Sequence, residues 1–176
     1  MKFRRLVLAT LLAGAVGFQD CSIPGWVNTV ESDADVAAPI AASLIAVIDP
    51  PLTPVVTLIE NGFNTLVKTL DTYKAMPTAT NLQAVQSAFQ AVSANVAQLE
   101  SAAQIKDSSI QDRVTSIVQL LAQVVTEIAA LLPPGMATAI KPPAKVEGEA
   151  KGWRAKDFRR EFNKIVKGDP RFKELK

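Results

Sequence analysis

The stretch from Asn81 to Leu132 decides the fold of this 176-residue chain. It reads NLQAVQSAFQAVSANVAQLESAAQ, then the polar break IKDSS, then IQDRVTSIVQLLAQVVTEIAALL. Apolar side chains recur at alternating spacings of three and four residues, which places them on one stripe of a helix. They are Leu82, Val85, Phe89, Val92, Val96 and Leu99, then Ile110, Val114, Ile117, Leu121, Val124, Ile128 and Leu131. The stretch therefore predicts an antiparallel hairpin of two long helices with a coiled-coil-like seam.

Two segments before this hairpin have the same period. Residues 53–76 carry an apolar stripe that keeps its phase across Asn61-Gly62, so a continuous helix is predicted there and not a β-hairpin turn. A shorter helix is predicted over 33–48, after Ser32 as a capping residue. The residues before it, 22–29 (SIPGWVNT), are expected to form a loop because Pro24-Gly25 is typical of a turn.

The predicted fold class is therefore all-α. It is an antiparallel helical bundle of three long helices plus one shorter, with an N-terminal signal or anchor helix and a separate C-terminal amphipathic helix. The expected domains are a signal peptide or membrane anchor (1–20), the bundle (32–133), a linker (134–151) and a basic amphipathic tail (152–176). A second apolar row at Val118, Val125 and Leu132 raises the alternative of self-association through an uncovered seam.

The N-terminus MKFRRLVLATLLAGAVGFQDC has a basic start followed by an uncharged apolar run from Leu6 to Phe18. This pattern is typical of a secretory signal peptide, with small residues near Ala15 for cleavage. The run is short for a membrane span, which needs roughly 20 apolar residues. Export is therefore expected, to a periplasmic, membrane-anchored or secreted location. A buried N-terminal helix is the alternative.

The single cysteine, Cys21, follows the apolar run and precedes Ser22, as in a bacterial lipoprotein. The residues before it are Phe18, Gln19 and Asp20, which depart from the small residues that a lipidation signal uses. Lipidation of Cys21 and a free thiol therefore stay as alternatives. A lone cysteine forms no intramolecular disulfide.

The chain has no histidine and one cysteine. A His/Cys metal site and catalysis by Ser-His-Asp or Cys-His are thereby excluded. Carboxylates such as Asp33, Asp35, Glu60 and Asp71 show no metal-loop spacing and are predicted to be solvated faces and caps. Glu127 and Arg113 are interpreted as marks of half-polar, water-soluble helices. We expect no enzymatic activity and no cofactor.

The net charge of +2 conceals an asymmetry. Residues 16–150 carry six basic and thirteen acidic side chains, whereas residues 151–176 carry ten basic and four acidic ones. The basic end has an apolar face with helical spacing and cations largely off that face, which suits an anionic membrane surface or a partner. The residues predicted for this role are Trp153, Arg154, Phe158, Arg159, Arg160, Phe162, Lys164 and Lys167. The alternative is that the aromatic face packs on the bundle.

These features favour a non-enzymatic, exported bacterial envelope protein that acts as a structural or interaction module. Its expected partners are a protein, or a second copy joined through the helical seams, and an anionic membrane surface; nucleic acid is disfavoured because the chain is expected to be exported. One alternative is a small membrane-active protein, such as a phage lysis accessory or holin-like factor. It would require a retained N-terminal helix or insertion of residues 36–59. Another alternative is a helical ligand carrier.

Overall fold

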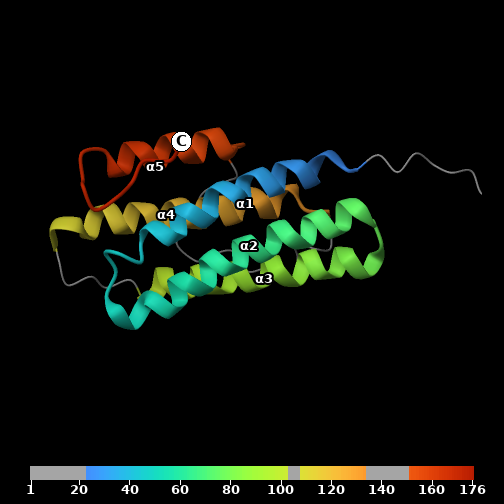
Figure 1. Ribbon diagram of the computed structural model, residues 1–176, viewed down its shortest axis with the longest axis horizontal. Coiled ribbons are helices and arrows are strands. Elements are labelled where there is room, and N and C mark those ends of the chain that lie inside the picture. Colours follow the sequence, from blue (N-terminus) through green and yellow to red (C-terminus); the bar gives the residue numbers. More distant parts are fainter. Residues whose placement is uncertain (1–22, 103–107, 134–150) are drawn as a thin grey trace, which may run out of the picture.

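The computed structural model describes residues 23–102, 108–133 and 151–176, which form five packed α-helices (Figure 1). None of these described residues lies in a strand, so the predicted all-α class is confirmed. The elements are α1 (Gly25–Ser43), the short 3-10 helix η1 (Pro50–Leu52), α2 (Thr53–Ala75), α3 (Ala79–Ala102), α4 (Ser108–Leu131) and α5 (Ala155–Val166).

Successive helices run in opposite directions, and α1 to α4 close into a four-helix bundle (Figure 1). Helix α2 packs on α1 and α3, and α4 closes the ring by contacting α3 and α1. Helix α5 lies on the outside of this ring and contacts α1 and α4 together. The C-terminal part of the chain therefore packs across α1 and α4.

Prolines and polar caps set the helix boundaries. Helix α2 begins at Thr53 with Pro54 in its first turn, where a missing backbone N–H costs nothing. It ends before Met76-Pro77, and Thr78 then accepts a hydrogen bond from the Asn81 N–H at 3.2 Å, which caps α3. The three long helices therefore lie close to where the apolar period places them.

Gly62 lies inside α2, as the continuous stripe predicts. A Cβ atom at this position would come within 2.7 Å of Cγ2 of Val92 on α3. The glycine therefore allows α2 and α3 to approach closely. The packing energy of this contact offsets the cost of placing glycine, a poor helix former, inside a helix.

The prediction of a loop at residues 22–29 is wrong where the structure describes these residues, because α1 begins at Gly25. The helix predicted over 33–48 is observed as Gly25–Ser43. Val27 and Val30 are fully buried, and Trp26 stacks on Tyr73 of α2 with ring centroids 6.0 Å apart. Pro24 stands just before the first turn, where a proline is tolerated. Burial of this first turn against the bundle outweighs the turn signal of Pro24-Gly25.

The expectation of a separate C-terminal helix is also wrong. Phe158 and Phe162 are fully buried and Val166 nearly so, because α5 packs against α1 and α4. The second apolar row on α4 is buried within the same chain, so it presents no uncovered seam. The predicted signal or anchor helix (1–20), Cys21 and nearly all of the predicted linker (134–151) lie outside the described residues.

Candidate functional site

The C-terminal segment, residues 151–176, brings the predicted site residues together on and around α5, but it divides them between two environments. Phe158 and Phe162 are fully buried, while Trp153 and Arg154 are half-buried at the start of the segment. The remaining four are exposed: Arg159, Arg160, Lys164 and Lys167. The aromatic face therefore packs on the bundle, and the cations form an outward face.

Glu127 on α4 fastens the start of this segment. Its side chain is buried, and its carboxylate accepts hydrogen bonds from the backbone N–H groups of Lys151 and Gly152, the latter at 3.1 Å. The side-chain amide of Gln123 donates a third at 2.7 Å, and Nη1 of Arg154 lies 3.9 Å away. These hydrogen bonds and the nearby Arg154 satisfy the buried carboxylate of Glu127, which holds the start of the segment at a fixed position.

Asp169 fastens the other end. It follows Gly168, whose φ of 77° turns the chain at the end of α5. Its buried carboxylate accepts hydrogen bonds from the guanidinium groups of Arg171 and of Arg113 on α4. The Arg171 guanidinium, with help from its backbone N–H and from Arg113, holds the pKa of Asp169 well below its usual range.

The chain after Asp169 turns back and is closed by an amide pair. The side chain of Asn163 on α5 accepts a hydrogen bond from the Leu175 N–H at 2.8 Å and donates one to the Leu175 carbonyl at 2.9 Å. Phe172, which lies in this returning stretch, is buried and belongs to the hydrophobic core. The C-terminal segment is thus a folded unit of the bundle down to Leu175.

Asp33 on α1 faces the start of α5 and differs from both anchors. It is 1% exposed, and neither of its carboxylate oxygens has a hydrogen-bond partner among the residues that the structure describes. Burial raises the pKa of Asp33 to about 6. The Ala155 N–H and the Arg154 guanidinium act in the opposite direction, without completing a hydrogen bond, whereas the carboxylates of Glu127 and Asp157 add to the increase.

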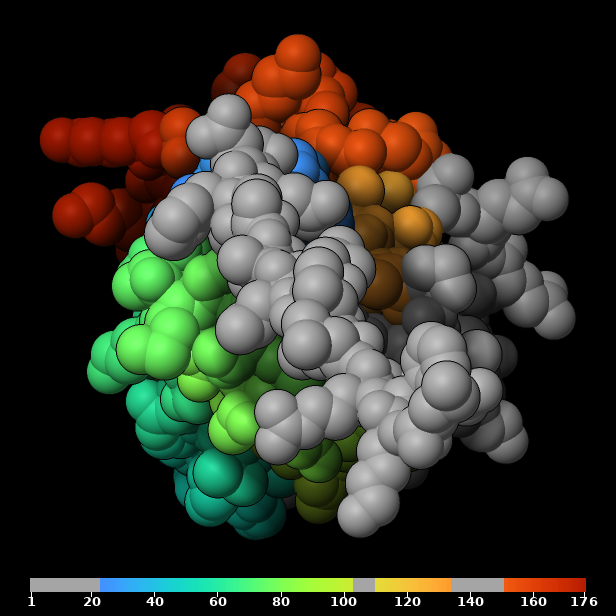
Figure 2. Space-filling model, turned by 90° about the vertical axis from the view of Figure 1, so that its right-hand side faces the viewer, coloured from blue at the N-terminus to red at the C-terminus, as the bar shows by residue number. Residues whose placement is uncertain are grey.

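A groove of about 490 Å³ opens above Asp33, between the N-terminal half of α1 and the start of α5. Figure 2 looks onto this end of the molecule, where the orange atoms of the C-terminal segment lie beside the blue atoms of α1. Polar residues of α1 and cations of α5 line the groove: Asn28, Thr29, Ser32, Asp33, Arg154, Ala155, Lys156 and Arg159. Three of these side chains are cationic, and Asp33 is the one carboxylate among them.

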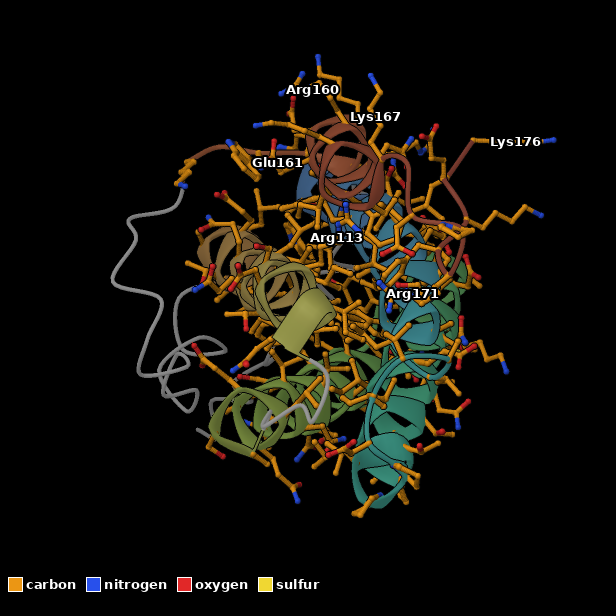
Figure 3. All side chains as sticks on the ribbon, turned by 90° about the vertical axis from the view of Figure 1, so that its left-hand side faces the viewer. Arg113, Arg160, Glu161, Lys167, Arg171 and Lys176 are labelled. Atoms are coloured by element: carbon orange, nitrogen blue, oxygen red, sulfur yellow. The ribbon has the colours of Figure 1, made fainter. Side chains whose placement is uncertain are left out.

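The cations of α5 form an outward face, which Figure 3 shows from the opposite end. Arg160, Lys167 and Lys176 point away from the bundle, whereas Arg113 and Arg171 point inward beneath the segment. Arg160 and Lys164 are 70% and 76% exposed, and among the described residues each pairs with an acid three residues earlier on the same helix. Exposed pairs of this kind leave the cations largely available to other anions.

Membrane insertion has one candidate among the described helices. Residues Ile110–Leu131 of α4 have the length and a mean hydropathy of 1.7 that a membrane span requires, and 61% of the apolar window is buried inside the protein. A core helix of a folded bundle has the same properties. No group of three or more acidic or cysteine side chains gathers as a metal site within the described part of the chain.

Comparison with protein-family models, with curated proteins and with solved structures finds no match to this chain.

The sequence analysis missed the roles of three polar residues. The interpretation of Asp33 as a solvated cap is wrong because α5 covers it, and Glu127 and Arg113 act as anchors for the C-terminal segment. Asp35 and Asp71 are exposed, as predicted. One signal for Glu127 was present, since it is the only charge in the apolar run after Arg113.

Proposed function

We propose that this chain is a non-enzymatic, exported envelope protein whose helical bundle presents the basic outer face of α5 to an anionic membrane surface. The observation that carries the proposal is the division of α5 into a buried aromatic face and an exposed cationic one. A fixed row of lysine and arginine on a folded helix attracts anionic lipid at roughly 1 kcal/mol per residue.

The contact is electrostatic and peripheral. Phe158 and Phe162 are engaged in the core, so they are not free to enter the lipid headgroup region while α5 is docked. Attraction between exposed charges falls steeply with ionic strength. We therefore expect reversible binding that is weakened by salt, together with export directed by the apolar N-terminal sequence.

Vesicle co-sedimentation tests this proposal. The full chain should bind vesicles that contain phosphatidylglycerol and should not bind neutral phosphatidylcholine vesicles. Reversing three cations, in the variant Arg160→Glu, Lys164→Glu and Lys167→Glu, should weaken binding by more than about 100-fold. Lys68→Glu, at an exposed position on α2, is the matched control and should have a much smaller effect.

Equal binding to neutral and anionic vesicles, or an unchanged affinity of the triple variant, would refute the surface proposal. Intact masses of the chain from membrane and soluble fractions test the export part. A chain shortened by about fifteen residues supports a cleaved signal peptide. An unmodified full-length chain in the cytoplasm contradicts export.

The membrane-active alternative predicts a different result. It requires a retained N-terminal helix or insertion of residues 36–59, and expression should then depolarise cells. Helix α4 is a further candidate by its length and hydropathy. In the folded chain, α4 is surrounded by α1, α3 and α5, and it carries the buried Glu127. A charge in a bilayer-spanning helix costs about 2.5–3.5 kcal/mol or more, which disfavours insertion of α4.

A further inference from the structure

The groove between α1 and α5 contains an unbalanced set of hydrogen-bonding groups. Arg154, Lys156 and Arg159 line its α5 side, and Asn28, Thr29 and Ser32 line its α1 side. The Thr29 hydroxyl already donates to the Gly25 carbonyl, and Nη1 of Arg154 to the Trp153 carbonyl. The N–H groups of Lys156, Arg159 and Asn28 and the Ser32 hydroxyl are the other donors of the groove. The floor is the carboxyl of Asp33, which is buried and has no hydrogen-bond partner within the described residues.

A buried polar group without a completed hydrogen bond is costly, since the water that it loses on burial is only partly compensated by nearby groups such as the Ala155 N–H. Retention of such a group beside an open groove points to a ligand that supplies the missing partner. The ligand must be anionic to suit three cations, and it must also bring a proton for the Asp33 carboxyl. A phosphate monoester satisfies both requirements, because its second pKa is about 6 and its monoanion carries one O–H donor.

We propose that this groove binds a phosphate monoester group together with one proton, which is shared between a phosphate oxygen and the carboxyl of Asp33. Lys156 and Arg159 pair with the remaining phosphate oxygens, and the half-buried Arg154 pairs with the side nearest Asp33. Ser32 donates its hydroxyl from α1. No covalent bond forms or breaks; the complex holds one proton that the separate dianion and carboxylate lack.

The proton is essential because a phosphate dianion and an ionised Asp33 repel each other. The groups that face Asp33 are Glu127 on α4 and Arg154, Asp157 and the Ala155 N–H at the start of α5. Their charges are one cation against two carboxylates. Burial and the two carboxylates together favour the protonated form of Asp33. The groove can therefore take up a proton when the phosphate binds.

This inference concerns the groove at one end of α5, whereas the proposed surface contact uses the outward face of the same helix. It depends on the proposed function in one respect only, which is whether the phosphate group comes from a membrane lipid. A free phosphate ester and a phosphomonoester lipid headgroup have the same chemistry. The two sources are separated by the probes below.

Isothermal titration calorimetry of the full chain with glycerol 3-phosphate measures the site directly. Titrations in two buffers of different ionisation enthalpy count the protons exchanged. We expect uptake of about one proton at pH 7.5, and an affinity about tenfold lower at pH 7.5 than at pH 6.5. Binding without proton uptake, or no binding at either pH, overturns the proposal.

Variants assign the proton to its residue. Asp33→Asn supplies an N–H donor without titrating, so it should bind the dianion at pH 7.5 as tightly as the native chain does near pH 6, with no proton uptake. Asp35→Asn, at an exposed position on the same helix, should behave as the native chain. Lys156→Gln with Arg159→Gln should lose at least tenfold in affinity. An Asp33→Asn chain that folds but still binds with proton uptake also refutes the assignment.

Vesicles separate this proposal from the surface contact. Phosphatidic acid carries a monoester phosphate, whereas phosphatidylglycerol carries a diester with no proton that titrates in this range. Preference for phosphatidic acid that disappears in Asp33→Asn supports a lipid source. If the chain binds glycerol 3-phosphate and binds vesicles of the two lipids equally, or binds neither kind of vesicle, the natural ligand is a soluble phosphate ester. If the chain binds vesicles of both lipids equally but does not bind glycerol 3-phosphate, the surface contact is supported and the groove site is refuted.

Discussion

The two ends of the C-terminal segment meet the bundle through buried acids in opposite electrostatic states. Asp169 at the far end accepts hydrogen bonds from two arginines, and its pKa is held well below the usual range. Asp33 at the near end has no hydrogen-bond partner among the described residues, and burial raises its pKa to about 6. Burial alone therefore does not decide the charge of a carboxyl. The donors that are buried with it do.

The difference divides the segment into a fixed end and a responsive end. The far end is closed by arginines that stay charged at any physiological pH. The near end combines the fully bonded Glu127 with the unsatisfied Asp33. The groove between α1 and α5 opens at this near end, and Asp33 is among the residues that line it.

The largest effect should come from Glu127→Ala, which would break the near end. The variant leaves the N–H groups of Lys151 and Gly152 without their acceptor and should reduce the free energy of unfolding by about 3–5 kcal/mol. Urea unfolding followed by circular dichroism measures it. Asp112→Ala, at an exposed position on α4, is the control and should change stability by less than about 0.5 kcal/mol. Equal effects of the two substitutions would show that Glu127 is not an anchor.

Asp33→Asn should stabilise the protein at neutral pH. The folded-state pKa of Asp33 lies above its ordinary value of 3.8, so its contribution to stability is present below about pH 4 and is lost as the pH rises through 6. At pH 7.5 the native chain should be less stable than Asp33→Asn by about 1–3 kcal/mol. Thermal unfolding at several pH values checks this. If Asp33→Asn is less stable than the native chain at every pH, the ionised carboxyl of Asp33 does not destabilise the fold.

Asp169→Asn should have the opposite pH dependence. The pKa of Asp169 is depressed, so its contribution is present at neutral pH and is lost as the pH falls below about 4. The variant should be less stable than the native chain at pH 7 and equal to it in strong acid. Arg113→Gln should reproduce part of this loss, because it removes one of the two arginines. A substitution without effect at pH 7 would mean that the far end is not fastened by this group.

The smallest effect should come from Arg160→Ala on the outer face of α5. The Arg160 side chain is 70% exposed in its ion pair with Asp157, and surface pairs contribute about 0–1 kcal/mol. The free energy of unfolding should therefore change little, while binding to anionic vesicles should weaken. A large loss of stability would place Arg160 in the core of the segment and not on its surface.

Much of the bundle could be predicted from the sequence, because the apolar period is a local property of each helix. The stripes of α2, α3 and α4 place these helices to within about two residues, including the passage of α2 through Gly62. The start of α1 could not be predicted from Pro24-Gly25, since packing of Val27 and Val30 decides it. Local signals are weakest at such boundaries.

The polar contacts of the site could not be predicted, because they join residues far apart in the chain. Glu127 bonds to residues 24 and 25 positions away, and Arg113 to a residue 56 positions away. Nothing near Asp33 in the sequence indicates that α5 will cover it. The amphipathic pattern of α5 is compatible with a membrane surface or with a bundle, and only the contacts of Phe158 and Phe162 distinguish them.

The measurement that tests the account most directly is a carboxyl carbon NMR titration of Asp33 and Asp169 in the same sample. The account predicts that Asp33 titrates with a midpoint near pH 6 and that Asp169 stays ionised until the protein unfolds in acid. A midpoint for Asp33 near its ordinary pKa of 3.8 would contradict the account. It would mean that water or a donor reaches this carboxyl and that the two ends of the segment are alike.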